Sequence, residues 1–274
     1  MSAVPSEVPV ASRRSPARAI GGALADAALP VGTTVAVIAV WQLISSVGSF
    51  PEYILPSPTA VADAAVENAG SLASETLVTV LETIVGFALA VAFALPLAVA
   101  IVVWPPLKKS IYPLLILVQS VPKVALAPIF LVWIGFGPWP KILIAALACF
   151  FPVFLDAAAG FASTPREAVD LFRSLRAKKA HTFWKLRVPH ALPHIFVGLK
   201  VGVTFAVIGA VVAEFVQSSE GLGYLILISS SQLKTDLAFA AMIVLALISI
   251  VLFYALEWIE RLAVPWAERE AGEA

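Results

Sequence analysis

Charge, cysteine and nucleotide-binding motifs are all scarce in this sequence. Only 13% of the 274 residues are charged, Lys+Arg and Asp+Glu both number 18, and Cys149 is the one cysteine. The balanced charge gives no sign of a nucleic-acid partner. A lone thiol inside an apolar run forms no internal disulfide, so Cys149 is predicted to be a packing residue. The pattern Gly-x-x-x-x-Gly-Lys-Ser/Thr does not occur, which excludes a phosphate-binding P-loop and predicts that any ATP is handled by another chain.

The sequence also lacks the constellations that catalysis or metal binding would need. His190 and His194 are spaced as two ligands on one helix, but Pro193 lies between them and no nearby carboxylate or thiol completes a set. No nucleophile and base are paired within the apolar segments. We therefore predict a chain that is not an enzyme, with no catalytic residue, no metal site and no cofactor of its own.

Apolar residues, in contrast, are abundant. They make up 60% of the chain, and the mean hydropathy is +0.95. A helix needs about 20 mostly apolar residues to cross the hydrocarbon, and in lipid its backbone groups must pair within the segment. The sequence therefore predicts an all-α integral membrane protein with about six transmembrane helices, at 29–47, 77–104, 111–134, 139–161, 195–215 and 237–259.

The basic residues set the expected orientation. Segment 48–76 holds Glu52, Asp63, Glu67 and Glu75 but neither Lys nor Arg. With both termini inside, 14 of the 18 basic residues fall in cytoplasmic segments, as the positive-inside rule requires. The prediction is a multi-pass protein of the cytoplasmic (inner) membrane with N-in and C-in topology. It has a tail at 1–27, a transmembrane domain at 28–263 and a tail at 264–274. Ser57 before Pro58 predicts the capped start of a short outer helix.

The loop at 163–193 separates the fourth and fifth spans on the basic side. Thr164, Pro165 and Glu167 are spaced as a capping box that starts a helix. Apolar residues then recur at helical spacing among many cations. Two interpretations stay open from this pattern: a charged helical hairpin lying on lipid headgroups, or a socket for a cytoplasmic protein.

Four elements recur in this loop at fixed spacings: Asp170-Leu171-Phe172, then Arg176 after three residues, Leu186 after nine more, and Val188-Pro189 after one more. This order resembles the EAA loop of binding-protein-dependent ABC permeases, whose pattern is Glu-Ala-Ala, three residues, Gly, nine residues, Ile, one residue, Leu-Pro. Segments 55–58, 121–128, 191–200, 209–215 and 221–226 are also similar to the nitrate/sulfonate/taurine and hydroxymethylpyrimidine branch of these importers.

The resemblance implies a type I ABC importer permease fold and several partners. These are cytoplasmic ABC ATPase subunits that bind ATP and Mg, a second permease copy in a homodimer, and an extracytoplasmic solute-binding protein. Arg176 replaces the family's glycine, and a left-handed conformation there would cost about 1 kcal/mol relative to glycine. The residues implied to form the ATPase-coupling loop are Asp170, Leu171, Phe172, Leu175, Arg176, Ala177, Phe183, Leu186 and Pro189.

Polar residues within the spans are candidates for the translocation pathway. Gln119, Ser120 and Lys123 lie around Pro122 in the third span, where a broken helix could line a cavity; a kinked packing helix is the alternative. Glu214, near the outer end of the fifth span, is a candidate for an outer gate or a binding-protein contact.

A stripe of small residues in the fifth span allows close approach of another helix, with a pathway face as the alternative. The stripe consists of Gly198, Gly202, Ala206 and Ala210.

Three functional classes were weighed for this pattern. A transport permease explains the spans, the long basic loop and the small-residue stripe together. An intramembrane enzyme lacks its reactive groups, and a secondary transporter would show repeated halves with interrupted spans. For the solute, Lys123 suits an anion such as a sulfonate, nitrate or carboxylate, while the resemblance suits a small heterocycle equally well.

Overall fold

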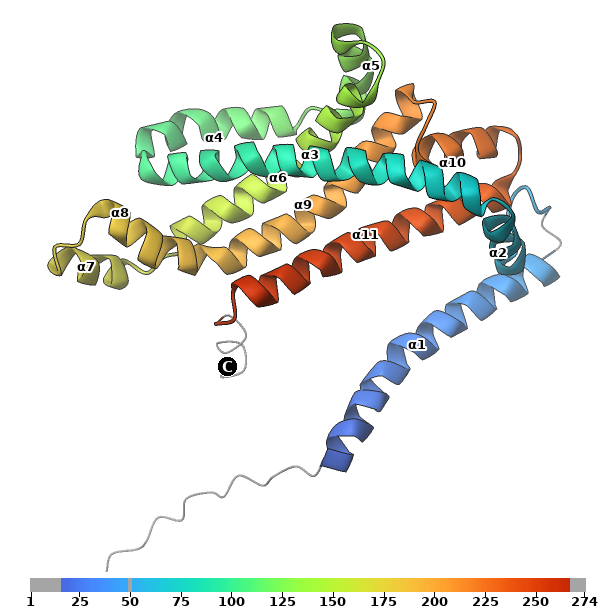
Figure 1. Ribbon diagram of the computed structural model, residues 1–274, viewed down its shortest axis with the longest axis horizontal. Coiled ribbons are helices and arrows are strands. Elements are labelled where there is room, and N and C mark those ends of the chain that lie inside the picture. The colour runs from blue at the N-terminus through green and yellow to red at the C-terminus, as the bar shows by residue number, and fades with distance from the viewer. Residues whose placement is uncertain (1–15, 49–50, 267–274) are drawn as a thin grey trace, which may run out of the picture. The chain divides into compact units, whose positions relative to one another are not determined.

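The computed structural model describes residues 16–48 and 51–266, and within these ranges it contains helices and no strand (Figure 1). The chain packs as two units, residues 1–60 and 61–274, which are described separately. The helices are α1 (Pro16–Val47), α2 (Pro58–Glu67), α3 (Ala69–Val103), α4 (Pro105–Gln119), α5 (Lys123–Ile134), α6 (Pro138–Ala162), α7 (Arg166–Ser174), α8 (Lys179–Thr182), the π-helical turn η1 (Phe183–Arg187), α9 (Val188–Gln217), α10 (Leu222–Ser231) and α11 (Thr235–Ala263).

The all-α class predicted from hydropathy is confirmed. Five segments are long and apolar enough to cross a membrane, and they are Leu29–Val47, Ala69–Val103, Pro138–Ala162, Lys179–Val216 and Thr235–Ala263. The two predicted tails fall mostly on residues 1–15 and 267–274, outside the described ranges, so those boundaries stay predictions.

The third predicted span is not one continuous helix. Its two halves, α4 and α5, are bent by 92° at a break after Gln119. Pro122 lies at the N-cap of α5 with ψ 113, in extended backbone. It has no N–H to donate, and proline disfavours helical backbone in the residue before it, so the α4 ladder ends at Ser120. The segment predicted at 111–134 is therefore at most a broken span.

In the first unit, the loop between α1 and α2 is held by two polar contacts. The Trp41 indole N–H donates to the Pro56 carbonyl at 3.1 Å. The Ala60 backbone N–H donates to the Ser57 hydroxyl oxygen at 3.2 Å, which confirms Ser57 as the cap of α2. The first contact joins α1 to Pro56, and the second caps the start of α2.

In the second unit, α3, α6 and α9 pack together and form its core. The core is built from small residues and a few large ones: Ala94 and Ala98 of α3, and Phe154 and Ala157 of α6, are essentially inaccessible. A Cβ added to Gly209 of α9 would lie 2.8 Å from the Ala145 Cα of α6. Small side chains at these contacts let the helix backbones approach closely. Close packing of this kind drives the association of helices in lipid.

Candidate functional site

The helix α7 starts differently from the predicted capping box. Pro165 occupies the N-cap position, and no side chain hydrogen-bonds to the first-turn N–H groups in this described segment. The Thr164 hydroxyl donates instead to the Phe161 carbonyl at 3.3 Å. The prediction was wrong because the end of α6 offers Thr164 a nearer acceptor, and hydroxyl groups next to helix ends readily bond backward. Glu167 remains in the first turn, where its negative charge suits the positive end of the helix dipole.

The end of α7 is a Schellman turn with an arginine in place of the usual glycine. The Ala177 N–H donates to the Phe172 carbonyl at 3.0 Å, and the Arg176 N–H donates to the Arg173 carbonyl at 2.9 Å. These are the two hydrogen bonds that define the motif. Arg176 has φ +54, which is the left-handed conformation considered for it above. The turn keeps its geometry, then, at a backbone cost of about 1 kcal/mol relative to glycine.

Two leucines of this segment are left uncovered. Leu171 is 58% exposed and Leu175 is 71% exposed, whereas Phe172 is half-buried. Trp184, in η1, is 67% exposed. Exposed large apolar side chains one helical turn apart, as Leu171 and Leu175 are, are typical of a binding surface.

Among the other residues of the predicted coupling loop, Phe183 joins the loop to the bundle. Phe183 stacks on Phe161 of α6 with a centroid distance of 5.6 Å. Asp170 pairs with Arg173 at 2.9 Å on the α7 surface. The remaining three predicted residues are half-buried, and they are Ala177, Leu186 and Pro189.

The candidate pathway residues gather at the break between α4 and α5. Gln119 and Lys123 line a small pocket together with Phe150 and Phe151 of α6. Lys123 is half-buried and Gln119 is exposed. Ser120 is exposed, and its hydroxyl donates back to the Ile116 carbonyl at 3.0 Å. The break thus places an amide and an ammonium group beside two aromatic rings.

Glu214 lies at the other end of α9 and is completely buried. The Thr79 hydroxyl donates to Glu214 Oε1 at 2.7 Å, and the Gly223 N–H donates to Glu214 Oε2 at 2.6 Å. The Leu222 N–H in turn donates to Thr79 Oγ1 at 2.9 Å. Glu214 and Thr79 therefore satisfy the free N–H groups at the start of α10, where the helix dipole also favours a negative charge.

A buried ion pair, which the sequence reasoning missed, lies next to Glu214. Lys141 of α6 pairs with Glu82 of α3, and both residues are less than 10% exposed. Lys141 also donates to the Ser218 hydroxyl oxygen at 3.1 Å and interacts electrostatically with Glu214. We call Glu82, Lys141, Glu214 and Thr79 the buried polar cluster. The available signal was the presence of Glu82 and Lys141 inside predicted spans, since ionisable residues there are rare and tend to be paired.

The small residues of α9 face another helix of the same chain. A Cβ on Gly198 would lie 2.7 Å from the Asp156 Cβ, and one on Gly202 would lie 2.5 Å from Val153 Cγ2. Ala206 and Ala210 are fully buried. All four positions thus lie in the interior of the second unit.

Residues 90–269 match the model of the binding-protein-dependent transport system inner membrane component. This range covers α6, the loop helices, α9, α10 and α11, and so includes the predicted coupling loop. The chain belongs to the binding-protein-dependent transport permeases. It is a multi-pass membrane subunit of an ABC importer for a small solute, a family whose members work with an ATPase and a substrate-binding protein.

Individual relatives are similar over nearly the whole permease. A probable ABC transporter permease protein of Haemophilus influenzae is 37% identical over 80% of this chain and 90% of its own length. The formylaminopyrimidine transport permease protein ThiX of Halalkalibacterium halodurans is 33% identical over 84% of this chain and 92% of its own. Among solved structures, the inward-facing MetNI methionine ABC transporter matches with a TM-score of 0.61 at 16% identity, over 70% of this chain and 96% of that one, which shows the shared fold.

A second ion pair of the permease was also missed. Lys200 of α9 donates to Glu260 Oε2 of α11 at 2.6 Å, with both side chains 18% exposed. The Lys200 ammonium also lies 5.9 Å from the centroid of the Phe253 ring. Because the partners are 60 residues apart in sequence, the pair joins α11 to the core.

Proposed function

We propose that the permease couples to its ATPase through α7 and the turn that ends it. The observation that carries this proposal is the pair of exposed leucines, Leu171 and Leu175, on a short helix that otherwise presents charged residues. An apolar side chain that fills a partner's groove often contributes about 2 kcal/mol to binding. The Schellman turn fixes the end of α7, and the Phe161–Phe183 stack joins the loop to α6, so that a displacement of α7 would be passed to the bundle.

The experiment replaces Leu175 with Asp and, separately, Phe172 with Asp. Each variant should insert and purify normally. Its affinity for the ATPase should fall about 30-fold, which corresponds to about 2 kcal/mol of binding free energy. Lys178→Ala, an exposed position just after the turn, is the matched control and should bind as wild type. The measurements are pull-down of the ATPase and solute-stimulated ATP hydrolysis in reconstituted vesicles. Wild-type coupling by both Asp variants would contradict the docking role.

We further propose that both termini are cytoplasmic, which places α7 on the side where ATP is available. The support is the distribution of Lys and Arg, with 14 of 18 in segments that would then be inside. Cysteines introduced at Asp63 and Lys178 in a Cys149→Ala background should react with an impermeant maleimide from opposite faces of sealed vesicles. Labelling of both from one face would contradict this topology.

For the solute, we propose a small molecule with a planar heterocycle that passes the break between α4 and α5. Phe150 and Phe151 offer aromatic surface there, while Gln119 and Lys123 offer hydrogen bonds, and this combination suits a flat polar ring. The similarity to a formylaminopyrimidine permease supports the same class. A sulfonate or carboxylate is the second candidate, because Lys123 is a cation. Uptake of labelled pyrimidines and of taurine by the reconstituted importer would distinguish the two classes.

We propose that two copies of this chain enclose the pathway between them. The support is that Gln119 and Ser120 are exposed in the single chain, so that one copy alone does not enclose the proposed route. Cross-linking between cysteines placed at Ser120 of two copies would test this arrangement, and the absence of any dimer on oxidation would count against it.

A further inference from the structure

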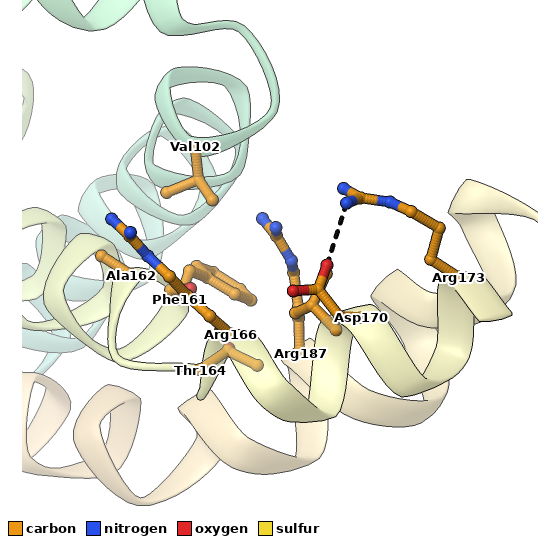
Figure 2. Close-up of a pocket in the computed structure, with 9 residues that line it drawn as sticks. Val102, Phe161, Ala162, Thr164, Arg166, Asp170, Arg173 and Arg187 are labelled. Atoms are coloured by element: carbon orange, nitrogen blue, oxygen red, sulfur yellow. Dashed lines mark hydrogen bonds and ion pairs between the residues drawn. The ribbon is translucent and has the colours of Figure 1, made fainter.

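A basic pocket lies between the end of α3 and the loop helices. It consists of two adjoining hollows, with volumes of about 440 and 640 Å³, that share Val102, Val169, Arg173 and Arg187. Figure 2 shows that the guanidinium groups of Arg166, Arg173 and Arg187 extend toward one side of the pocket, with Val102 of α3 beside them. We call this feature the arginine pocket.

The charge of the arginine pocket is strongly unbalanced. Arg166, Arg173, Arg187 and Lys179 line it, and Asp170 is the one carboxylate in its lining. Asp170 is already bonded to Arg173 at 2.9 Å. Among the side chains described in residues 29–48 and 51–266, no carboxylate forms a salt bridge with Arg166 or Arg187. The pocket therefore presents guanidinium groups, the preferred bidentate ligands of phosphate, to an anion from outside the chain.

The depth of the pocket indicates what kind of anion reaches it. Val102 and Val103 are the last residues of α3, a helix long and apolar enough to cross the membrane. Trp104, directly after them, is 60% exposed, and Trp184 of the pocket lining is 67% exposed. Tryptophan is enriched where the hydrocarbon meets the headgroups. An apolar side that continues a membrane-spanning helix and is flanked by tryptophans suits the hydrocarbon edge, which would place the arginines at headgroup level.

The pocket and the proposed ATPase surface use different faces of α7. At about 100° per residue, Arg166, Val169, Asp170 and Arg173 fall on one face of the helix and line the pocket. Leu171 and Leu175 fall on nearly the opposite face. The arginine pocket therefore stays open to another ligand when the leucine face is covered.

From these observations, we propose that the arginine pocket binds the phosphate headgroup of an anionic phospholipid. The phosphate lies among Arg166, Arg173 and Arg187, and the upper part of an acyl chain lies along Val102, Val103 and Phe183. A zwitterionic headgroup is disfavoured because its ammonium group would face a net charge of +3 in the lining. Basic pockets at the membrane surface recognise anionic headgroups by this combination of charge and depth. The inference concerns a lipid site and does not depend on the proposed solute or on the ATPase docking.

The test uses the purified full-length permease in a neutral detergent, titrated with phosphatidylglycerol, phosphatidylcholine or inorganic phosphate. Retained lipid is counted by native mass spectrometry, and the melting temperature is followed in parallel. The variant is Arg166→Gln/Arg187→Gln. The control is Lys108→Gln/Lys109→Gln, which removes the same charge from two exposed residues of α4 that do not line the pocket.

We expect one phosphatidylglycerol per chain to bind at least about tenfold more tightly than phosphatidylcholine. The arginine variant should lose about tenfold or more in this affinity, because each charge-assisted hydrogen bond to phosphate is worth about one order of magnitude. The lysine variant should keep it. Arg166→Lys/Arg187→Lys retains the charge but not the bidentate geometry, and its affinity for phosphatidylglycerol should lie between those of the other two variants. An intermediate affinity would show that the weaker binding of the glutamine variant does not come from loss of folding.

Three results would overturn the proposal. Equal loss in the arginine and lysine variants would mean a general attraction of anions to this end of the protein. An equal rise in melting temperature with inorganic phosphate, at the same concentration as phosphatidylglycerol, would mean that the pocket is a site for a free anion. Loss of the ATPase from the arginine variant in lipid-free detergent would mean that the pocket is covered by protein.

Discussion

Gly221, the residue before α10, is the position at which a single methyl group should disrupt the buried polar cluster. Its φ of +102 and ψ of 160 lie in a region that only glycine populates freely. An added Cβ would lie 2.2 Å from Oε1 of Glu214 and 2.3 Å from its Cδ. Gly221→Ala therefore combines backbone strain with a collision against a completely buried carboxylate.

The chain supplies a control that separates these two effects. Gly135, at the end of α5, has φ +91 and ψ −175, which is nearly the same backbone conformation. A Cβ on Gly135 would meet no heavy atom within 4 Å, leaving out its chain neighbours. Gly135→Ala should thus cost about 1–3 kcal/mol of folding free energy from strain alone.

At Gly221 the carboxylate must also move. It would then lose the hydrogen bonds donated by Thr79 and by the Gly223 N–H, each worth about 1.5–3 kcal/mol for a charged acceptor. We expect Gly221→Ala to be destabilised by about 3 kcal/mol more than Gly135→Ala.

Unfolding of both variants and of wild type in a mixed detergent series, followed by circular dichroism, measures this difference. Equal midpoints for the two alanine variants would refute the position of Glu214 against the start of α10. A low midpoint for Gly221→Ala that Glu214→Ala in the same chain partly restores would support the collision specifically.

Three further predictions address the loop, the second ion pair and the α4–α5 break. Arg176→Gly should raise the stability of the permease by about 1 kcal/mol, since it removes a side chain from left-handed backbone, and should leave ATPase binding unchanged; a lower melting temperature would count against the Schellman turn. Lys200→Met should destabilise the permease by about 3 kcal/mol because it leaves Glu260 without its partner, and Lys200→Met/Glu260→Gln should recover most of this loss in the same unfolding assay; no recovery would show that the pair is not coupled. Lys123→Ala should reduce solute uptake at least about tenfold, through the loss of one hydrogen bond to a buried solute, while the amount of assembled transporter stays constant; wild-type uptake would remove Lys123 from the pathway.

The sequence predicted those parts of the fold that depend on local composition. Hydropathy along the chain is a one-dimensional property, so span 29–47 and the approximate positions of four others could be predicted from the length of apolar runs. The Ser57 cap could be predicted because donor and acceptor lie three residues apart. The capping box at Thr164 failed for a reason that is also local, since a competing carbonyl at Phe161 lies equally close in sequence.

The remaining features depend on how helices pack. Pro122 predicted a disruption of the third span, as a broken helix or as a kink, but the 92° bend itself depends on what α4 and α5 pack against. Glu82 and Lys141 were each visible as charges in apolar runs. Their pairing requires α3 and α6 to lie side by side with these residues at the same depth, which no spacing in the sequence encodes. The arginine pocket was missed for the same reason, because Val102 is more than 60 residues from Arg166.

The close contacts along α6 limit how a transport cycle can proceed. Gly86 of α3 and Gly160, Gly198, Gly202 and Gly209 of α6 and α9 all lie where a single methyl group would collide with the facing helix. Surfaces that interlock this tightly do not slide past one another without first separating, and separation would expose the buried polar cluster to lipid. We therefore expect α3, α6 and α9 to move as one rigid body during transport, with the loop helices at one end and α10 at the other. Relative motion is left to the more loosely attached elements, above all α4 and α5 around their break.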